Sequence, residues 1–125
     1  MRILLVEDSS AMRAFVRAAL EEDGDVQLTE APSGFEALRL LPRDKFDLVI
    51  TDINMPDING LEVISFIRRS EAHRQTPLLI ISTEASVRDR ERAMALGANG
   101  YLTKPFQPDE LRDAVRKLRT QASGA

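Results

Sequence analysis

Short apolar runs alternate with longer amphipathic stretches along the chain, and the runs have the length of β-strands. Three of them are almost wholly apolar, at residues 2–6 (RILLV), 46–50 (FDLVI) and 77–82 (PLLIIS). Strands buried on both faces have this composition, which is typical of parallel sheets. Residues 26–30 (VQLTE) alternate more and are expected at a sheet edge, and residues 99–103 (NGYLT) form a short fifth candidate.

The intervals between and after these runs predict amphipathic helices. Their apolar residues recur at the spacing of one helix face: Met12, Phe15, Val16, Ala19, Leu20, Phe35, Leu38, Leu41, Leu61, Ile64, Ile67, Ala93, Met94, Leu111, Ala114, Val115 and Leu118. A strand followed by a helix, five times over, predicts an α/β fold. Its parallel sheet would carry helices on both faces, joined by right-handed crossovers.

Several helix ends are predicted from the residues that stand there. Ser33 and Glu36 have the spacing of a capping box at the start of the second helix. The fourth helix is expected to begin near Ser86 and to end at Gly97, a natural C-terminal cap. The last helix has Pro108 in its first turn.

Two further positions at helix starts carry expectations of their own. Gln107 is a poor N-cap for the last helix, where Asp, Ser or Thr would contribute about 1 kcal/mol more. Residues 57–60 (DING) predict a turn in which Gly60 relaxes the backbone before the third helix.

Composition and charge narrow the class of protein. The 125 residues suit one domain, expected at 1–119 and followed by a flexible tail or truncated linker at 120–125. The net charge of −3 gives no reason to expect direct nucleic-acid binding. The absence of cysteine excludes disulfides and thiolate chemistry. No apolar stretch is long enough to span a membrane or to form a secretory signal, so the expected location is the cytoplasm.

Polar side chains follow four of the predicted strands at the point where each strand ends. Glu7 and Asp8 follow the first strand, Asp52 the third, Ser82 the fourth and Lys104 the fifth. The carboxyl ends of parallel strands share one edge of the sheet, where open α/β folds bind their ligands. These residues are therefore expected to meet in one pocket.

The chemistry of this set favours phosphoryl transfer. Carboxylates that lie close together repel one another, and Mg²⁺, which prefers oxygen ligands, removes that repulsion. The ammonium of Lys104 and the hydroxyl of Ser82 suit the oxygens of a phosphoryl group. Asp52 is then the expected nucleophile, which becomes an acyl phosphate.

Four segments carry a resemblance to a known family. LLVEDSSAMR, DLVITDINMPDINGLEVI, LLIISTEAS and GANGYLTKPF resemble, in this order, the motif regions of response-regulator receiver domains. The resemblance covers the whole chain and is greatest to the single-domain, chemotaxis-type regulators. It implies a doubly wound, flavodoxin-like fold with strand order 2-1-3-4-5 and five helices.

The resemblance also implies roles for individual residues. Asp52 would be the phosphoacceptor. The Mg²⁺ ligands would be Asp8, Asp52 and the backbone carbonyl of Asn54, with Glu7 acting through water. Lys104 and Ser82 would contact the phosphoryl oxygens. Tyr101 would be an aromatic switch residue, and Lys104-Pro105 would be a cis peptide.

Positions beside the expected phosphoryl group bear on its lifetime. Asn54 and Glu84 match the chemotaxis type and border the path of the attacking water, so self-dephosphorylation is expected to be relatively quick. Thr83 is larger than the alanine or glycine common there and is expected to narrow access to the phosphoryl group.

The function implied is a phosphorylation-controlled signalling switch that catalyses only its own phosphorylation and dephosphorylation. Its expected partners are a sensor histidine kinase or phosphotransfer protein, and a downstream protein bound by the face of the fourth helix, fifth strand and fifth helix. A monomer or weak dimer is expected.

Three alternatives stay open from the residues alone. A haloacid-dehalogenase-type phosphatase would need a second aspartate where Asn54 stands. A flavodoxin-like FMN carrier would not place Glu7 and Asp8 in its phosphate-binding turn. A receiver-like binding module that never turns over phosphate is disfavoured by the complete acidic set with Ser82 and Lys104.

His73, the one histidine, is expected on the solvated surface.

Overall fold

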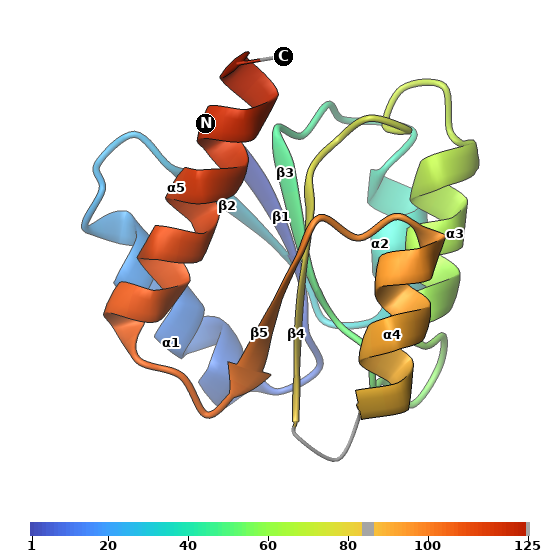
Figure 1. Ribbon diagram of the computed structural model, residues 1–125, viewed down its shortest axis with the longest axis horizontal. Coiled ribbons are helices and arrows are strands. Elements are labelled where there is room, and N and C mark those ends of the chain that lie inside the picture. The colour runs from blue at the N-terminus through green and yellow to red at the C-terminus, as the bar shows by residue number, and fades with distance from the viewer. Residues whose placement is uncertain (84–86, 125) are drawn as a thin grey trace.

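The computed structural model describes residues 1–83 and 87–124, in which five strands alternate with five helices (Figure 1). The strands are β1 (Arg2–Val6), β2 (Gln27–Ala31), β3 (Leu48–Asp52), β4 (Leu78–Thr83) and β5 (Gly100–Lys104). The helices are α1 (Ser10–Glu21), α2 (Gly34–Leu40), α3 (Gly60–Arg69), α4 (Val87–Leu96) and α5 (Pro108–Gly124). All the strands and helices predicted from the sequence are present.

The strands form one parallel sheet in the order β2-β1-β3-β4-β5, which confirms the doubly wound fold. Every residue of β3 is buried, and so are nearly all those of β1 and β4. The outer strands β2 and β5 are only partly covered. The continuous apolar runs are thus the inner strands, and the alternating run lies at an edge as predicted.

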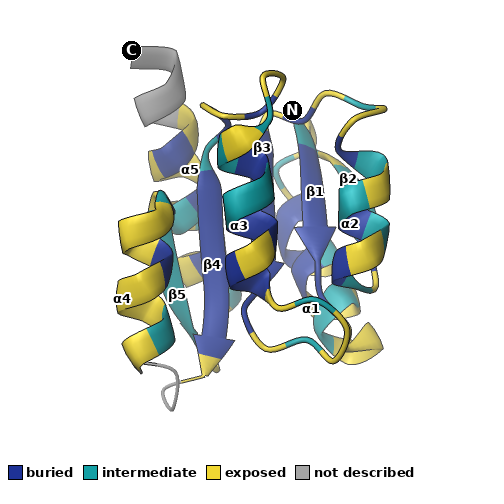
Figure 2. Ribbon diagram, turned by 90° about the vertical axis from the view of Figure 1, so that its right-hand side faces the viewer, coloured by how far each residue is buried: buried dark blue, intermediate teal, exposed yellow. Residues whose placement is uncertain are grey.

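Helices cover both faces of the sheet (Figures 1 and 2). On one face α1 and α5 pack over a core that includes Leu5, Leu20, Ile50 and Val115. On the other face α2, α3 and α4 enclose a second core that includes Val49, Ile64 and Ile80. Not every periodic apolar position is buried, since Phe35 is 65% exposed.

The helix ends follow the predicted capping chemistry. The Ser33 side chain accepts a hydrogen bond from the N–H of Glu36 at the start of α2. After α4, Gly97 has φ +120° and the Ala98 N–H donates to the Ala93 carbonyl at 3.0 Å, the long bond of a Schellman motif. The start of this helix expected near Ser86 lies outside the described residues.

The first turn of α5 compensates for its weak N-cap. The carboxylate of Glu110 accepts a hydrogen bond from the Gln107 N–H at 2.9 Å. This is one of the two hydrogen bonds of a capping box, and it uses the backbone N–H of the N-cap residue rather than its side chain. The helix runs to Gly124, beyond residue 119; the division into a domain and a tail stays a prediction.

His73 is buried, and its predicted place on the solvated surface is wrong. Its side chain is fully covered, and its Nε2 accepts a hydrogen bond from the Phe46 N–H at 3.3 Å. The two rings lie 6.1 Å apart between centroids. The polar loop after α3 folds back under the start of β3, and nothing in the local sequence indicates that contact.

Gly60 serves a different purpose from the predicted one. Its φ is not positive, so it does not relieve the turn by a left-handed conformation. A Cβ at this position would lie 2.2 Å from the Asp52 carbonyl oxygen and 2.7 Å from the Ile53 Cα. Glycine is needed here because the start of α3 packs directly against the end of β3.

None of the described helices is long and apolar enough to cross a membrane.

Candidate phosphoryl-transfer site

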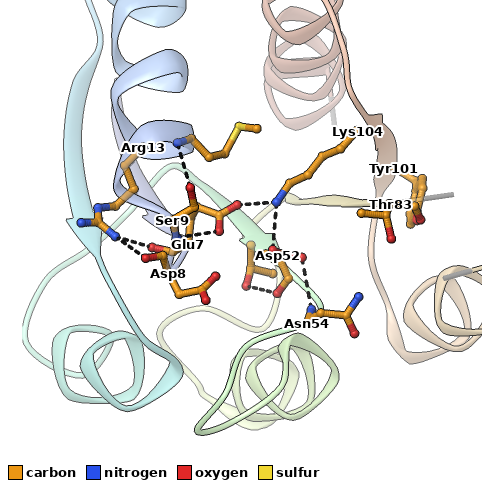
Figure 3. Close-up of polar contacts among 11 residues, drawn as sticks. Glu7, Asp8, Ser9, Arg13, Asp52, Asn54, Thr83, Tyr101 and Lys104 are labelled. Carbon is orange, nitrogen blue, oxygen red and sulfur yellow. Dashed lines mark hydrogen bonds and ion pairs between the residues drawn. The ribbon is translucent and has the colours of Figure 1, made fainter. Parts of the chain in front are cut away.

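A buried ion-pair cluster lies where β1, β3 and β5 end (Figure 3). The Lys104 ammonium lies 2.6 Å from Glu7 Oε1 and 2.9 Å from Asp52 Oδ2. The Glu7 and Asp52 side chains are 1% and 7% exposed, and that of Lys104 is 16% exposed. Three residues separated by up to 97 positions in the chain therefore share one largely desolvated site.

The turns after β1 and β3 hold the two carboxylates in place. Ser9 caps α1, and its N–H donates to Glu7 Oε2 at 3.1 Å. The N–H of Asn54 donates to Asp52 Oδ1 at 3.1 Å, while Lys104 occupies Oδ2. Both oxygens of Asp52 are thus oriented by the protein.

Burial and ion pairing shift the acid–base behaviour of this cluster. Burial raises the pKa of Glu7, and the neighbouring Asp52 adds to the shift, whereas hydrogen bonds from Lys104 and Ser9 oppose it. Burial alone would lower the pKa of Lys104, but its hydrogen bonds to Glu7 and Asp52 outweigh burial and raise that pKa. Lys104 therefore stays charged while it bridges the two acids.

Three carboxylates at this site fit a divalent cation. Glu7, Asp8 and Asp52 each offer an oxygen, and these oxygens lie within 4.8 Å of one another. Glu7 and Asp52 are buried and Asp8 is exposed, so the cluster opens to solvent on the Asp8 side. Hard oxygen donors with one open side suit Mg²⁺, which keeps several of its waters.

The remaining predicted residues lie around the ends of β4 and β5. Ser82 is fully buried, and its Oγ has no hydrogen-bond partner among the residues that the structure describes. It stands one position beyond Ile81, the register partner of Asp52. Thr83 and Asn54 are exposed. Glu84 lies outside the described residues.

Tyr101 is half-buried against the core under α4. Its hydroxyl donates to the Thr83 carbonyl at 3.4 Å, and the Arg90 guanidinium lies 4.8 Å from the ring centroid. The peptide bond between Lys104 and Pro105 is cis, as the family resemblance implies.

Two residues that support the site escaped prediction. Arg13 of α1 donates to the backbone carbonyls of Glu7 and Asp8. Asp57 accepts hydrogen bonds from the N–H groups of Gly34 and Phe35, which ties the loop after β3 to the start of α2. The N–H of Phe35 is the main cause that lowers the pKa of Asp57. Both contacts join distant elements, and neither an arginine in a predicted helix nor an aspartate in a predicted turn indicates such a contact in the sequence.

Fold and site together define a receiver. The model of the response regulator receiver domain matches residues 3–116, and the chain belongs to that family.

Individual relatives support the likeness to single-domain regulators. The chain is 37% identical over 118 residues to the chemotaxis protein CheY-3 of Vibrio cholerae, covering 94% of this chain and 91% of that protein. The structure of CheY4 from the same species superposes with a TM-score of 0.86 at 33% identity, covering 94% and 97% of the two chains.

A further solved structure is informative about metal. The receiver domain of the sensor histidine kinase PA1611 from Pseudomonas aeruginosa holds a magnesium ion coordinated in its active-site cleft. It superposes on this chain with a TM-score of 0.86 at 30% identity, covering 94% of this chain and 96% of that one.

Proposed function

We propose that this chain is a response regulator whose Asp52 accepts a phosphoryl group from the phosphohistidine of a sensor kinase or phosphotransfer protein. An oxygen of Asp52 bonds to phosphorus, the nitrogen–phosphorus bond of the donor breaks, and the imidazole leaves with a proton. The product is an acyl phosphate on Asp52. The observation that carries the proposal is the Lys104 ammonium, held between Glu7 and Asp52 at hydrogen-bonding distance.

Asp52 is better suited to nucleophilic attack than its acidic neighbours. Glu7 is the more deeply buried of the pair, and burial raises its pKa. Asp8 is exposed and offers an oxygen to the shared cluster. Asp52 terminates a fully buried strand, and both of its oxygens are oriented, by Lys104 and by the Asn54 N–H.

Asp8, Asp52 and the backbone carbonyl of Asn54 would hold Mg²⁺ directly, and Glu7 would hold it through water. The ion would neutralise charge on the transferring oxygens and lower the repulsion between them and the carboxylates. Lys104 is free to leave Glu7 when another cation balances that acid, and it can then follow a phosphoryl oxygen on its long stem.

Phosphorylation of Asp52 would switch the face made by α4, β5 and α5. The new charge attracts the ammonium of Lys104 and the buried hydroxyl of Ser82, and Tyr101 then repacks inward. This biases the face toward a state that binds a downstream protein. The chain would be a switch that catalyses only its own phosphorylation and dephosphorylation, and it would act in the cytoplasm as a monomer or weak dimer.

Loss of the phosphoryl group would need a water beside Asp52. Asn54 is exposed beside Asp52, which would let water approach there, whereas the Thr83 side chain would narrow that approach; Glu84 is the third residue proposed to border this path. Relatively quick self-dephosphorylation is expected. A phospho-form that persisted for many hours with Mg²⁺ present would contradict this lifetime.

The decisive experiment is the intact mass of the chain after incubation with acetyl phosphate and Mg²⁺. The wild type should gain one phosphoryl group, and Asp52→Ala or EDTA should abolish the gain. Asp44→Ala, which removes an aspartate far from the cluster, is the matched control and should be phosphorylated like the wild type. Lys104→Ala should still be phosphorylated but should gain no partner affinity in response.

The failure of this experiment would favour the receiver-like binding module. If the wild type shows no adduct even at short times, and beryllofluoride does not bind, then Asp52 is not a phosphoacceptor. If Lys104→Ala still responds to phosphorylation, Lys104 does not couple the site to the binding face.

A further inference from the structure

The turn between β1 and α1 carries two of the three clustered carboxylates, and its backbone leaves two carbonyl groups outside regular structure. The Glu7 N–H still belongs to the sheet, since it donates to the Ala31 carbonyl at 3.0 Å. The carbonyls of Glu7 and Asp8 lie in the turn that follows, before the helix that begins at Ser10. Both accept hydrogen bonds from Nη1 of Arg13, at 2.8 and 3.1 Å (Figure 3).

Arg13 is itself held by a carboxylate of the sheet. Its Nε donates to Glu30 Oε1 at 3.2 Å, and the side chains of Arg13 and Glu30 are only 19% and 28% exposed. The other oxygen of Glu30 accepts from Nε of Arg17 at 2.7 Å. The guanidinium of Arg13 thus connects strand β2 to the turn, and Arg17 contacts the same glutamate without reaching the turn.

We infer that Arg13 is a positioning residue for the cation site, because it holds the backbone carbonyls of Glu7 and Asp8, the two residues of this turn whose carboxylates belong to the site. The inference rests on the proposed function, in which these carboxylates hold Mg²⁺. Arg13 and Lys104 approach the turn from opposite sides, one at the backbone carbonyls and the other at the Glu7 carboxylate (Figure 3). A turn held from both sides presents its carboxylates in one arrangement before the ion arrives.

Positioning and simple electrostatics predict opposite effects of removing this arginine. A guanidinium near a cation site repels the cation, so charge alone would make Mg²⁺ bind more tightly when Arg13 is removed. Loss of positioning would make it bind more weakly, because the turn must then be ordered when the ion binds. Groups that orient metal ligands typically change metal affinity by about 10- to 100-fold.

The test is isothermal titration of Mg²⁺ into the wild type and three variants. Arg13→Ala should bind Mg²⁺ about tenfold more weakly. Arg17→Ala removes the same charge from the same helix and loosens the same glutamate, but should bind as tightly as the wild type or slightly more tightly. Arg13→Lys keeps the charge and loses the planar fork that reaches Glu30 and the turn together, so it should also bind more weakly.

A purely structural role is separated by a second measurement. The free energy of unfolding without Mg²⁺ is measured for each variant, and titrations are run where circular dichroism shows every variant fully folded. A structural role alone would lower stability and leave the Mg²⁺ affinity of the folded chain unchanged.

The outcomes distinguish this inference from the proposed function. If Arg13→Ala binds Mg²⁺ as tightly as the wild type or more tightly, the positioning role is wrong and the proposed function stands. The same holds if Arg17→Ala weakens binding equally. If the wild type itself binds no Mg²⁺, the proposed cation site is wrong and the inference falls with it.

Discussion

Each end of the sheet contains a half-buried cationic side chain; one contacts charged carboxylates and the other contacts neutral oxygens. At the carboxyl ends of the strands, Lys104 contacts the carboxylates of Glu7 and Asp52. Near the other end, Arg68 donates to neutral oxygens alone among the described residues, chiefly the carbonyls of Gly97, Arg74 and Thr76 and Asn99 Oδ1. Burial acts to lower the pKa of both cations; at Lys104 the hydrogen bonds to carboxylates outweigh it and raise the pKa, whereas at Arg68 burial lowers the pKa.

The difference predicts how each end responds to a new charge. In the cluster at the carboxyl ends, the ammonium of Lys104 balances carboxylates. When a cation or a phosphoryl group enters, this ion pairing is no longer the arrangement of lowest energy, so the cluster is expected to rearrange. The guanidinium of Arg68 donates to neutral backbone carbonyls, so it has no charged partner that a new ion could replace. It joins the end of α4 to the loop before β4. One end is therefore suited to switching, and the other is a fixed point for α4.

The largest effect is expected from breaking the balance at the carboxyl end. Lys104→Met leaves Glu7 and Asp52 buried without their cation, which should cost about 3 kcal/mol of unfolding free energy near neutral pH. Mg²⁺ should restore more stability to this variant than to the wild type, since the ion replaces the missing charge. Urea denaturation with and without Mg²⁺ measures both effects.

Lys117→Met on the exposed face of α5 is the control and should change neither quantity appreciably. If Lys104→Met were as stable as the wild type, or if Mg²⁺ stabilised both equally, the balance of charges at this end would not be what holds it together.

The sequence predicted the switching end better than the fixed end. Parallel strands end at one edge, so apolar runs followed by Glu7, Asp52 and Lys104 were sufficient to predict their convergence. The double contact of Lys104 with both acids was not predictable, because it depends on side-chain reach across three strands. At the fixed end, His73 lies in a polar loop whose composition predicts exposure to solvent, yet the folded chain buries it beside Phe46.

A smaller loss is expected at the fixed end. Arg68→Met removes donors from the partly buried carbonyls of Gly97 and Thr76, and should cost about 2 kcal/mol of unfolding free energy. Its Mg²⁺ affinity should stay that of the wild type, because no carboxylate of the cluster depends on it. Arg69→Met is the neighbouring control, since that exposed guanidinium donates to the Ser65 carbonyl of its own helix.

Urea denaturation and Mg²⁺ titration of these two variants would sharpen the comparison of the two ends. A loss of Mg²⁺ affinity in Arg68→Met, beyond that of Arg69→Met, would show that the ends are coupled and that the fixed point also shapes the cation site.

The smallest effect concerns pH at His73. Burial lowers the pKa of His73 below its ordinary value of 6.5, and the charge of Lys45 lowers it further, whereas the Asp44 backbone opposes the shift. The unfolded chain therefore takes up this proton first as the pH falls. The stability from neutral His73 is complete above pH 6.5 and is lost as the pH falls toward the lower folded value.

His73→Gln isolates this contribution, because its amide oxygen can accept the Phe46 N–H bond at any pH, whereas a protonated imidazole offers only donors. Between about pH 7.5 and pH 5.5 the wild type should lose about 1 kcal/mol more unfolding free energy than this variant, the worth of one hydrogen bond. Carboxylates such as Glu7 titrate in both proteins and cancel in the difference. Equal losses would mean that charged His73 is hydrated in the folded chain. The fixed end would then accept a positive charge without a loss of stability, and the contrast between the two ends would be smaller than the contacts suggest.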